Sequence, residues 1–220
     1  RRAQLTRLMG RVSGKVALIT GGSDGIGYAS AWELANEGAT VVICARGQEA
    51  LDEAVNKISS ETGGVVSAIA CDVTDANQIE TTFQKLINDH GRVDILVNNA
   101  GHDIGGRRLF HEGAVQEWSA IIETNVIGLM RVTRVVLESM IRRDSGHIVN
   151  VGSIAGIQTS PLCSVYSASK HAVHGFSETL RLDYANTSIK VSEVLPGMVK
   201  TEFAVTRFAD EGRAAKYYED

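Results

Sequence analysis

The 220 residues are enough for one domain, and 44% of them are hydrophobic, which can fill a sizeable core. The formal net charge is −4, which excludes the basic surplus of a nucleic-acid-binding protein and leaves no long block of like charge. The longest apolar runs have the length of strands, so we expect no membrane span.

The first residues are set apart by their charge. They hold four arginines before the first apolar run, Arg1, Arg2, Arg7 and Arg11. A targeting segment would need an apolar stretch and a cleavage pattern, and neither is present here. We therefore expect residues 1–13 to form a flexible basic leader, and residues 14–220 to form one domain.

Apolar runs rich in β-branched residues alternate with helical patterns along the rest of the chain. Strands are predicted at 15–20, 40–45, 65–71, 95–100, 147–153 and 190–195. Helices are predicted at 25–38, 49–61, 75–90, 115–142 and 165–185. Thr74 or Asp75 can cap the third helix, and the fourth is expected to break near Asn125. Near-continuous apolar strands that alternate with helices predict a single α/β domain of three layers around a doubly wound parallel sheet.

The three cysteines, Cys44, Cys71 and Cys163, are scattered and show neither a CxxC pair nor the spacing of metal ligands. Cys44 and Cys71 fall in predicted strands, where a buried and inert thiol is expected. We therefore expect no metal site, and the pattern fits a reducing cytoplasm.

A glycine-rich segment, TGGSDGIG, joins the first predicted strand to the first predicted helix. Glycines permit a tight turn and a close approach of the backbone to a phosphate, and the helix N-terminus favours negative charge. This strand-turn-helix context indicates a Rossmann-type dinucleotide site rather than a plain glycine loop. The residues expected to contact the cofactor here are Gly21, Ser23, Asp24, Gly25, Ile26 and Gly27.

The end of the second strand bears on the choice between the two nicotinamide cofactors. An acidic residue there would bind the ribose 2′-hydroxyl of NAD and repel the 2′-phosphate of NADP. This chain has Ala45 followed by Arg46, so the phosphate is not repelled and a guanidinium can bind it. We favour NADP(H), although Asp24 argues for NAD(H) and Arg46 can also be an ordinary solvated cation.

Tyr166 and Lys170 lie four residues apart in a predicted helix and therefore share one face. An ammonium beside a phenol stabilises the phenolate and lowers the pKa of the tyrosine. Such a phenol can exchange a proton with an alcohol, and Ser153 can donate a hydrogen bond to the same substrate oxygen. The spacing alone is also compatible with an incidental surface pair.

Taken together, these motifs resemble those of the short-chain dehydrogenase/reductase family. The resemblance runs from about Gly14 to the last residues. Its motifs are the glycine turn, Asp72, Asn98-Asn-Ala-Gly101, Asn125, Ser153, Tyr166-x-x-x-Lys170, Pro196-Gly197 and Thr201. It implies that Ser153, Tyr166 and Lys170 are catalytic and that Asn125 holds a water linking Lys170 to solvent.

The resemblance also implies further contacts to the cofactor. Asp72 would bind the adenine beside the Val73 backbone, and Thr201 would contact the nicotinamide carboxamide. The remaining residues implied to contact the cofactor are Asn99, Ala100, Gly101, Tyr166, Lys170, Pro196, Gly197 and Val199.

The segment near 198–215 resembles the substrate lid of NADP-dependent dehydrogenases that act on 3-hydroxy acids such as serine and allo-threonine. Arg207 could clamp a substrate carboxylate, or pair with Asp210 or Glu211 at the lid surface. His102, Gln158 and Cys163 could line the substrate cleft or be simple loop residues. The loop after Gly101 is unusually polar, which departs from that group of enzymes.

The sequence therefore predicts an NADP-dependent oxidoreductase that reversibly transfers hydride between nicotinamide and a secondary alcohol or ketone, with a small-molecule substrate. The alternatives are a 3-oxoacyl-carrier reductase, a steroid or sugar alcohol reductase, and a non-catalytic NADP-binding scaffold or sensor.

The resemblance further implies a homodimer or homotetramer formed by the two long helices, for which Val132, Val135, Val136 and Leu137 supply apolar surface unless they face the sheet. Relatives continue into a further helix and a seventh strand, so we expect the C-terminal strand to be absent here.

Overall fold

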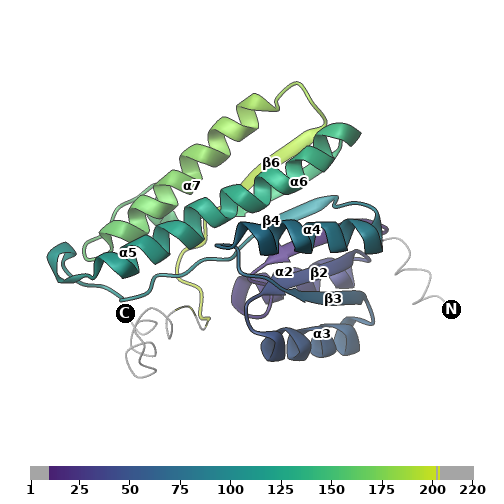
Figure 1. Cartoon of the computed structure of the whole chain (residues 1–220), viewed down its shortest axis with the longest axis horizontal. Coiled ribbons are helices and arrows are strands. Elements are labelled where there is room, and N and C mark those ends of the chain that lie inside the picture. Colours follow the sequence, from purple (N-terminus) through teal and green to yellow (C-terminus); the bar gives the residue numbers. More distant parts are fainter. Residues whose placement is uncertain (1–9, 202, 204–220) are drawn as a thin grey trace.

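The computed structural model describes residues 10–201 and 203. Within these residues six parallel strands form one sheet in the order β3-β2-β1-β4-β5-β6 (Figure 1). The strands are β1 (Val16–Thr20), β2 (Thr40–Ala45), β3 (Val65–Ala70), β4 (Ile95–Asn98), β5 (Gly146–Val151) and β6 (Ile189–Val194). The predicted doubly wound Rossmann-type sheet is confirmed, with each strand end within two residues of its predicted position.

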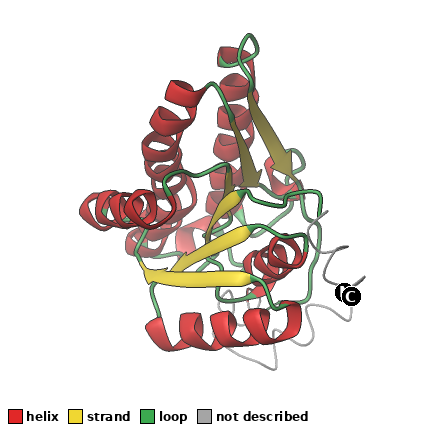
Figure 2. Cartoon of the chain, turned by 90° about the vertical axis from the view of Figure 1, so that its right-hand side faces the viewer, coloured by secondary structure: helices red, strands yellow, loops and turns green. Residues whose placement is uncertain are grey.

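Helices cover both faces of this sheet and give the three predicted layers (Figures 1 and 2). The helices are α2 (Gly25–Asn36), α3 (Gln48–Thr62), α4 (Ala76–His90), α5 (Val115–Ile122), α6 (Leu129–Arg143) and α7 (Ser164–Asp183). Two short 3₁₀ turns, η1 (Phe110–Glu112) and η3 (Ile154–Gly156), lie in the loops. None of the described helices is both long and apolar enough to cross a membrane.

The buried side chains form two clusters, one on each face of the sheet. The first packs α2 and α3 against the sheet through small and branched residues such as Ala31, Ala35 and Leu51. The second joins α4, α6 and α7 to the opposite face, and it includes Val132, Val136 and Leu137, with Val135 packed against it. Val132, Val136 and Leu137 therefore face the sheet, whereas Val135 packs against this cluster and stays partly exposed.

The predicted break in the long helix is confirmed. Between α5 and α6 the chain makes a π-helical turn, η2 (Glu123–Gly128), and Asn125 lies within it, almost fully buried. Single π turns are frequent at functional sites because they re-aim side chains within an otherwise regular helix. Asp75, not Thr74, caps α4: its carboxylate accepts hydrogen bonds from the backbone N–H groups of Asn77 and Gln78.

Two details of the sequence interpretation need correction. Ala29 belongs to the apolar pattern of the predicted helix 25–38, which indicates an inward position, but it is exposed, whereas Gly27 is buried. Cys44, Cys71 and Cys163 are all buried free thiols, but Cys71 follows β3 rather than lying in it. A hydrogen bond from Cys44 lowers the pKa of Cys71 to about 7, so this thiol ionises more readily than an inert core cysteine.

The order of the strands fixes where a ligand can bind. The strand order reverses at the centre of the sheet: β2 and β3 follow β1 on one side, and β4, β5 and β6 follow on the other. In open α/β sheets, ligands bind outside the carboxyl ends of the strands at such a switch point. The glycine turn after β1 and the loops after β4 and β5 meet at this edge.

Candidate active site

A cavity of about 510 Å³ lies at this edge of the sheet. Most of the predicted site residues line it, from four different stretches of the chain. The predicted residues in its wall are Gly21, Asp24, Gly25, Ile26, Asn99, Ala100, Gly101, His102, Ser153, Gln158, Cys163, Tyr166, Lys170, Pro196, Gly197, Val199 and Thr201. Six predicted residues that the structure describes, Ser23, Gly27, Arg46, Asp72, Val73 and Asn125, stand outside the wall.

The glycine turn is shaped by contacts that no side chain would tolerate. Gly21 and Gly25 have φ of +62° and +56°, a left-handed backbone that favours glycine. A Cβ on Gly27 would lie 2.1 Å from the Gly21 carbonyl oxygen and 2.4 Å from Asn99 Nδ2. The turn is therefore packed tightly against the first turn of α2.

The N-terminus of α2 is open towards the cavity. Asp24 is the N-cap residue but makes no side-chain capping hydrogen bond, and the first turn contains no acidic residue. Backbone N–H groups at a helix N-terminus attract phosphate, and the glycines leave space for it. The geometry thus fits the diphosphate of a dinucleotide.

The loop after β4 is joined to the glycine turn by a small network. Thr20 Oγ1 accepts hydrogen bonds of 3.0 Å from the backbone N–H groups of both Asn99 and Ala100. Asn99 Nδ2 donates in return to the carbonyls of Thr20 (3.1 Å) and Gly21 (2.9 Å). These bonds hold the two walls of the cavity at a fixed distance from each other.

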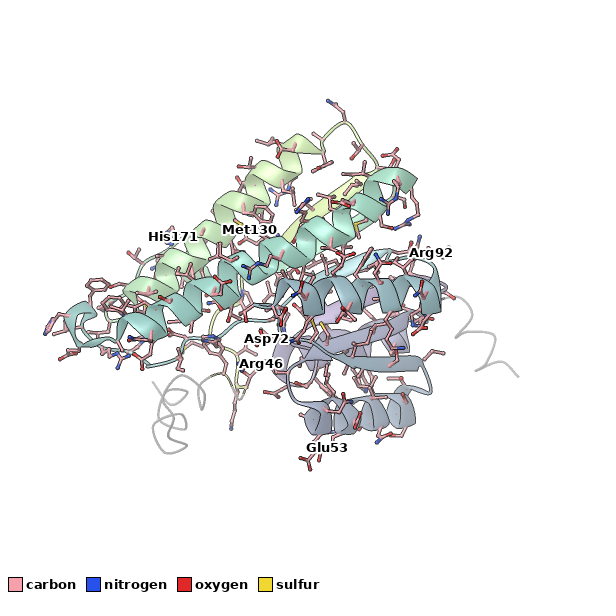
Figure 3. The ribbon with its side chains drawn as sticks, viewed as in Figure 1. Arg46, Glu53, Asp72, Arg92, Met130 and His171 are labelled. Atoms are coloured by element: carbon pink, nitrogen blue, oxygen red, sulfur yellow. The ribbon has the colours of Figure 1, made fainter. Side chains whose placement is uncertain are left out.

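The residues predicted at the adenosine end lie beside the cavity rather than in its wall. Arg46 and Asp72 follow the neighbouring strands β2 and β3 and lie at the same edge of the sheet (Figure 3). Asp72 Oδ1 accepts hydrogen bonds from the backbone N–H and the hydroxyl of Thr74, which hold the turn after β3. Val73 is buried, and a Cβ on Gly128 would contact it at 2.9 Å.

Ser153, Tyr166 and Lys170 meet in the cavity wall. Ser153 caps the turn η3, where its Oγ accepts a hydrogen bond of 3.1 Å from the Ala155 N–H. Tyr166 and Lys170 lie on consecutive turns of α7, with Lys170 Nζ 5.8 Å from the centre of the Tyr166 ring. The expected constellation of phenol, ammonium and hydroxyl is thus brought together from two separate elements.

Lys170 is deeply buried, and its ammonium donates a 2.9 Å hydrogen bond to the Val151 carbonyl. Burial lowers the pKa of Lys170 to about 8, while the negative charge of Glu193 acts in the opposite direction. A buried lysine with a depressed pKa in a cleft is a feature of functional sites.

Asn125 lies behind the wall and connects three parts of the site. Its Oδ1 accepts from the His102 N–H, and its Nδ2 donates to the His102 carbonyl, both at 2.9 Å. Nδ2 also donates to Ser169 Oγ at 3.1 Å, next to Lys170 in α7. The π turn thereby fastens the loop after β4 to the helix that carries the reactive pair.

At the substrate end, the four predicted residues have different outcomes. His102, Gln158 and Cys163 line the cavity. Burial and the charge of Arg46 both lower the pKa of His102. Arg207 lies outside the described residues, as does most of the predicted lid. Phe203 is a described residue of the lid, and its ring centre lies 5.7 Å from that of Tyr166.

The cavity wall also contains residues that sequence reasoning did not single out as site residues. They are Arg107, Val151, Gly152, Ile154, Ala155, Thr159, Ser160, Met198 and Phe203. Arg107 could have been found as one of two adjacent cations in a polar loop. The apolar residues gave no signal, because they look like ordinary neighbours of Ser153 and Gly197.

Residues 15–212 match the short chain dehydrogenase family. A putative ketoacyl reductase of Streptomyces coelicolor is 41% identical over 194 residues, covering 87% of this chain and 73% of that protein. An NADP-dependent 3-hydroxy acid dehydrogenase of Schizosaccharomyces pombe is 35% identical over 214 residues, covering 96% and 82%. The closed form of serine dehydrogenase with NADP⁺ superposes with a TM-score of 0.87 at 36% identity, covering 93% and 82%. The chain therefore belongs to the short-chain dehydrogenases and is an oxidoreductase that transfers hydride between a nicotinamide cofactor and an alcohol or ketone.

Proposed function

We propose that the enzyme uses NADP(H) and acts on a 3-hydroxy acid or the matching 3-oxo acid, with Ser153, Tyr166 and Lys170 as its catalytic residues. One observation carries the catalytic assignment: these three side chains meet in the wall of the cavity that the glycine turn also lines. The cofactor, when bound, supplies or accepts the hydride. The protein has to position the substrate and move one proton.

Tyr166 is the group that exchanges this proton with the substrate oxygen. In reduction its hydroxyl protonates the developing alkoxide, and in oxidation its phenolate removes the proton of the alcohol. Lys170, on the next turn of α7, stabilises the phenolate through its positive charge. Ser153 donates a hydrogen bond to the same substrate oxygen, where negative charge develops in the transition state.

Asn125 supports the site from behind. Its amide bridges the His102 backbone and Ser169, so it keeps the cavity wall and the catalytic helix in register. A water bound near this amide would connect Lys170 with solvent, which is the role that the family resemblance implies for it. The glycine turn, Asp72, Val73, Asn99 to Gly101 and Pro196 to Thr201 are the proposed contacts to the cofactor.

The preference for NADP(H) is supported by charge at the end of β2. The strand is followed by Arg46 and contains no carboxylate at its end. The positive charge of Arg46 also helps to lower the pKa of His102, a residue that lines the cavity. A guanidinium there can bind a 2′-phosphate, although Asp24 keeps NAD(H) as the alternative.

A carboxylate-bearing substrate is supported by Arg107, a cation that lines the same cavity as Ser153 and Tyr166. The names of two similar proteins, a 3-hydroxy acid dehydrogenase and a serine dehydrogenase, agree with this class. The name of the S. coelicolor relative favours a 3-oxoacyl thioester instead, and the exposed Ile154 and Met198 of the wall could contact such an acyl chain.

A substrate panel decides between these classes. The change in nicotinamide absorbance is followed with NADPH or NADH and three substrates of equal chain length: a 3-oxo acid, its methyl ester and its thioester. We expect the highest kcat/KM with NADPH and the free acid. A higher kcat/KM with the ester or thioester would contradict the acid assignment, and thermal stabilisation by NADPH without any turnover would favour a scaffold.

Three further features belong to the same proposal. We propose the division that the sequence predicts, with a basic leader at residues 1–13, a dinucleotide-binding catalytic domain at 14–220 and a substrate lid near 198–215. A homodimer or homotetramer is supported by the family resemblance, and light scattering on a size-exclusion column tests it. A cytoplasmic location is supported by the free thiols Cys44, Cys71 and Cys163.

A further inference from the structure

A buried carboxylate lies behind the catalytic helix, outside the cavity. Glu193 belongs to β6, and its side chain is only 5% exposed. Its Oε2 accepts a 2.7 Å hydrogen bond from His174 Nδ1, whereas Oε1 is buried without a hydrogen-bond partner in the described part of the chain. A buried charge with so few partners is unfavourable unless an opposite charge lies near it.

Lys170 provides that charge. Its Nζ donates to the carbonyl of Val151, at the end of β5. The next residue is Gly152, and a Cβ there would lie 2.3 Å from Glu193 Oε1. The ammonium and the carboxylate therefore both approach the peptide that joins Val151 to Gly152, and only a glycine leaves room for the carboxylate.

The other charged groups around Glu193 are few. From α7, Tyr166, Lys170 and His174 follow each other at intervals of four residues and share one face. Arg181, farther along this helix, binds the Val191 carbonyl and pairs with Glu178. The facing part of β5 supplies only uncharged groups, from Asn150 to Gly152. His174 is 34% exposed, so it connects the buried carboxylate with the surface.

We propose that Glu193 is a positioning residue for the catalytic lysine: its carboxylate, held by His174, keeps Lys170 charged and directed at the site. This rests on the proposed function, because it assumes that the ammonium of Lys170 supports Tyr166. Two observations support it independently of the packing around Gly152. The negative charge of Glu193 raises the pKa of Lys170 against the effect of burial. Of the three N–H groups of the Lys170 ammonium, only one donates a hydrogen bond to a described residue.

The test is the dependence of kcat/KM on pH for alcohol oxidation with saturating NADP⁺. Glu193→Gln preserves shape and removes the charge, so Lys170 should lose its proton at lower pH. We expect the alkaline loss of activity to move down by about one pH unit or more, because a nearby opposite charge typically shifts a pKa by that amount. Glu193→Asp keeps the negative charge, so its alkaline loss of activity should move less than that of Glu193→Gln. A purely structural role of Glu193 would not predict this difference.

His174→Phe removes the hydrogen bond to the carboxylate and should move the alkaline limb in the same direction. His171→Phe is the matched control, since His171 lies on the same helix and, among described residues, its side chain hydrogen-bonds only the Ser167 carbonyl. NADPH binding, followed by fluorescence, shows whether each variant is folded. If Glu193→Gln does not fold, His174→Phe decides.

An alkaline limb that stays in place in a folded Glu193→Gln or His174→Phe variant overturns this inference and leaves the proposed function intact. Turnover by Tyr166→Phe would overturn the proposed function itself. The two failures are therefore distinguishable.

Discussion

The buried charge of Lys170 should leave a measurable mark on stability. Its pKa is lowered from 10.5 to about 8, chiefly by burial. Below pH 8 the lysine is charged in both the folded and the unfolded protein, so the folded state carries the full penalty of burying it. Between pH 8 and 10.5 only the unfolded chain keeps the proton, and the free energy of unfolding therefore rises with pH.

The size of this rise follows from the pKa. Each unit of pKa corresponds to about 1.36 kcal/mol, so the depression of the Lys170 pKa is worth about 3 kcal/mol. Lys170→Met keeps the length of the side chain and removes the titration. The free energy of unfolding of the wild type minus that of Lys170→Met should thus rise by about 3 kcal/mol as the pH increases from 7 to 11.

Urea unfolding of both proteins at several pH values in this range, without cofactor, measures this difference. All other titrating groups are common to the two proteins, so the effects of those that do not interact with Lys170 cancel in the comparison. If the free energies of unfolding of the two proteins stay parallel with pH to within about 0.5 kcal/mol, the reasoning is refuted. Such a result would mean that the pKa of Lys170 is not lowered in the folded state.

Two other substitutions test the cofactor site. Arg46→Asp should lower the ratio of kcat/KM for NADPH over NADH by about 100-fold, because a charge-assisted bond to phosphate is replaced by repulsion. The control Arg134→Asp changes an exposed residue on α6 and should keep the wild-type ratio. Gly27→Ala should weaken NADPH binding, measured by fluorescence, by about 10-fold or more, because its Cβ would collide with the Gly21 carbonyl. Gly175→Ala, on α7, should bind NADPH normally, because no described atom outside its own helix backbone lies within 4 Å of its Cβ position. Equal binding by the two alanine variants would contradict the close packing of the turn.

The sequence predicted the fold because its strong signals are local. Apolar strands such as 40–45 alternate with amphipathic helices, and a glycine turn marks the switch point, so the order of the elements follows from periodicity. The break near Asn125 was also visible, but its form was not. A π turn is stabilised by contacts to His102 and Ser169, which are far away in the sequence.

The candidate site was predictable where residue type and spacing carry the chemistry, as in Tyr166 and Lys170. Contacts across the sheet were not predictable. Glu193 can be read from the sequence as a carboxylate within the predicted strand 190–195, but its nearness to Lys170 depends on the register of β5 and β6 and on the absence of a side chain at Gly152. Arg107 enters the cavity wall through the path of a loop, which no periodic pattern encodes.

The central claim is that the hydroxyl of Tyr166 moves the proton that accompanies hydride transfer. The most direct measurement compares kcat/KM and NADPH affinity between the wild type and Tyr166→Phe, which lacks only this oxygen. We predict that kcat/KM falls by about 10²-fold or more, the usual contribution of a general acid, while the dissociation constant of NADPH changes little. Retention of near wild-type kcat/KM by a Tyr166→Phe variant that binds NADPH normally would contradict the account.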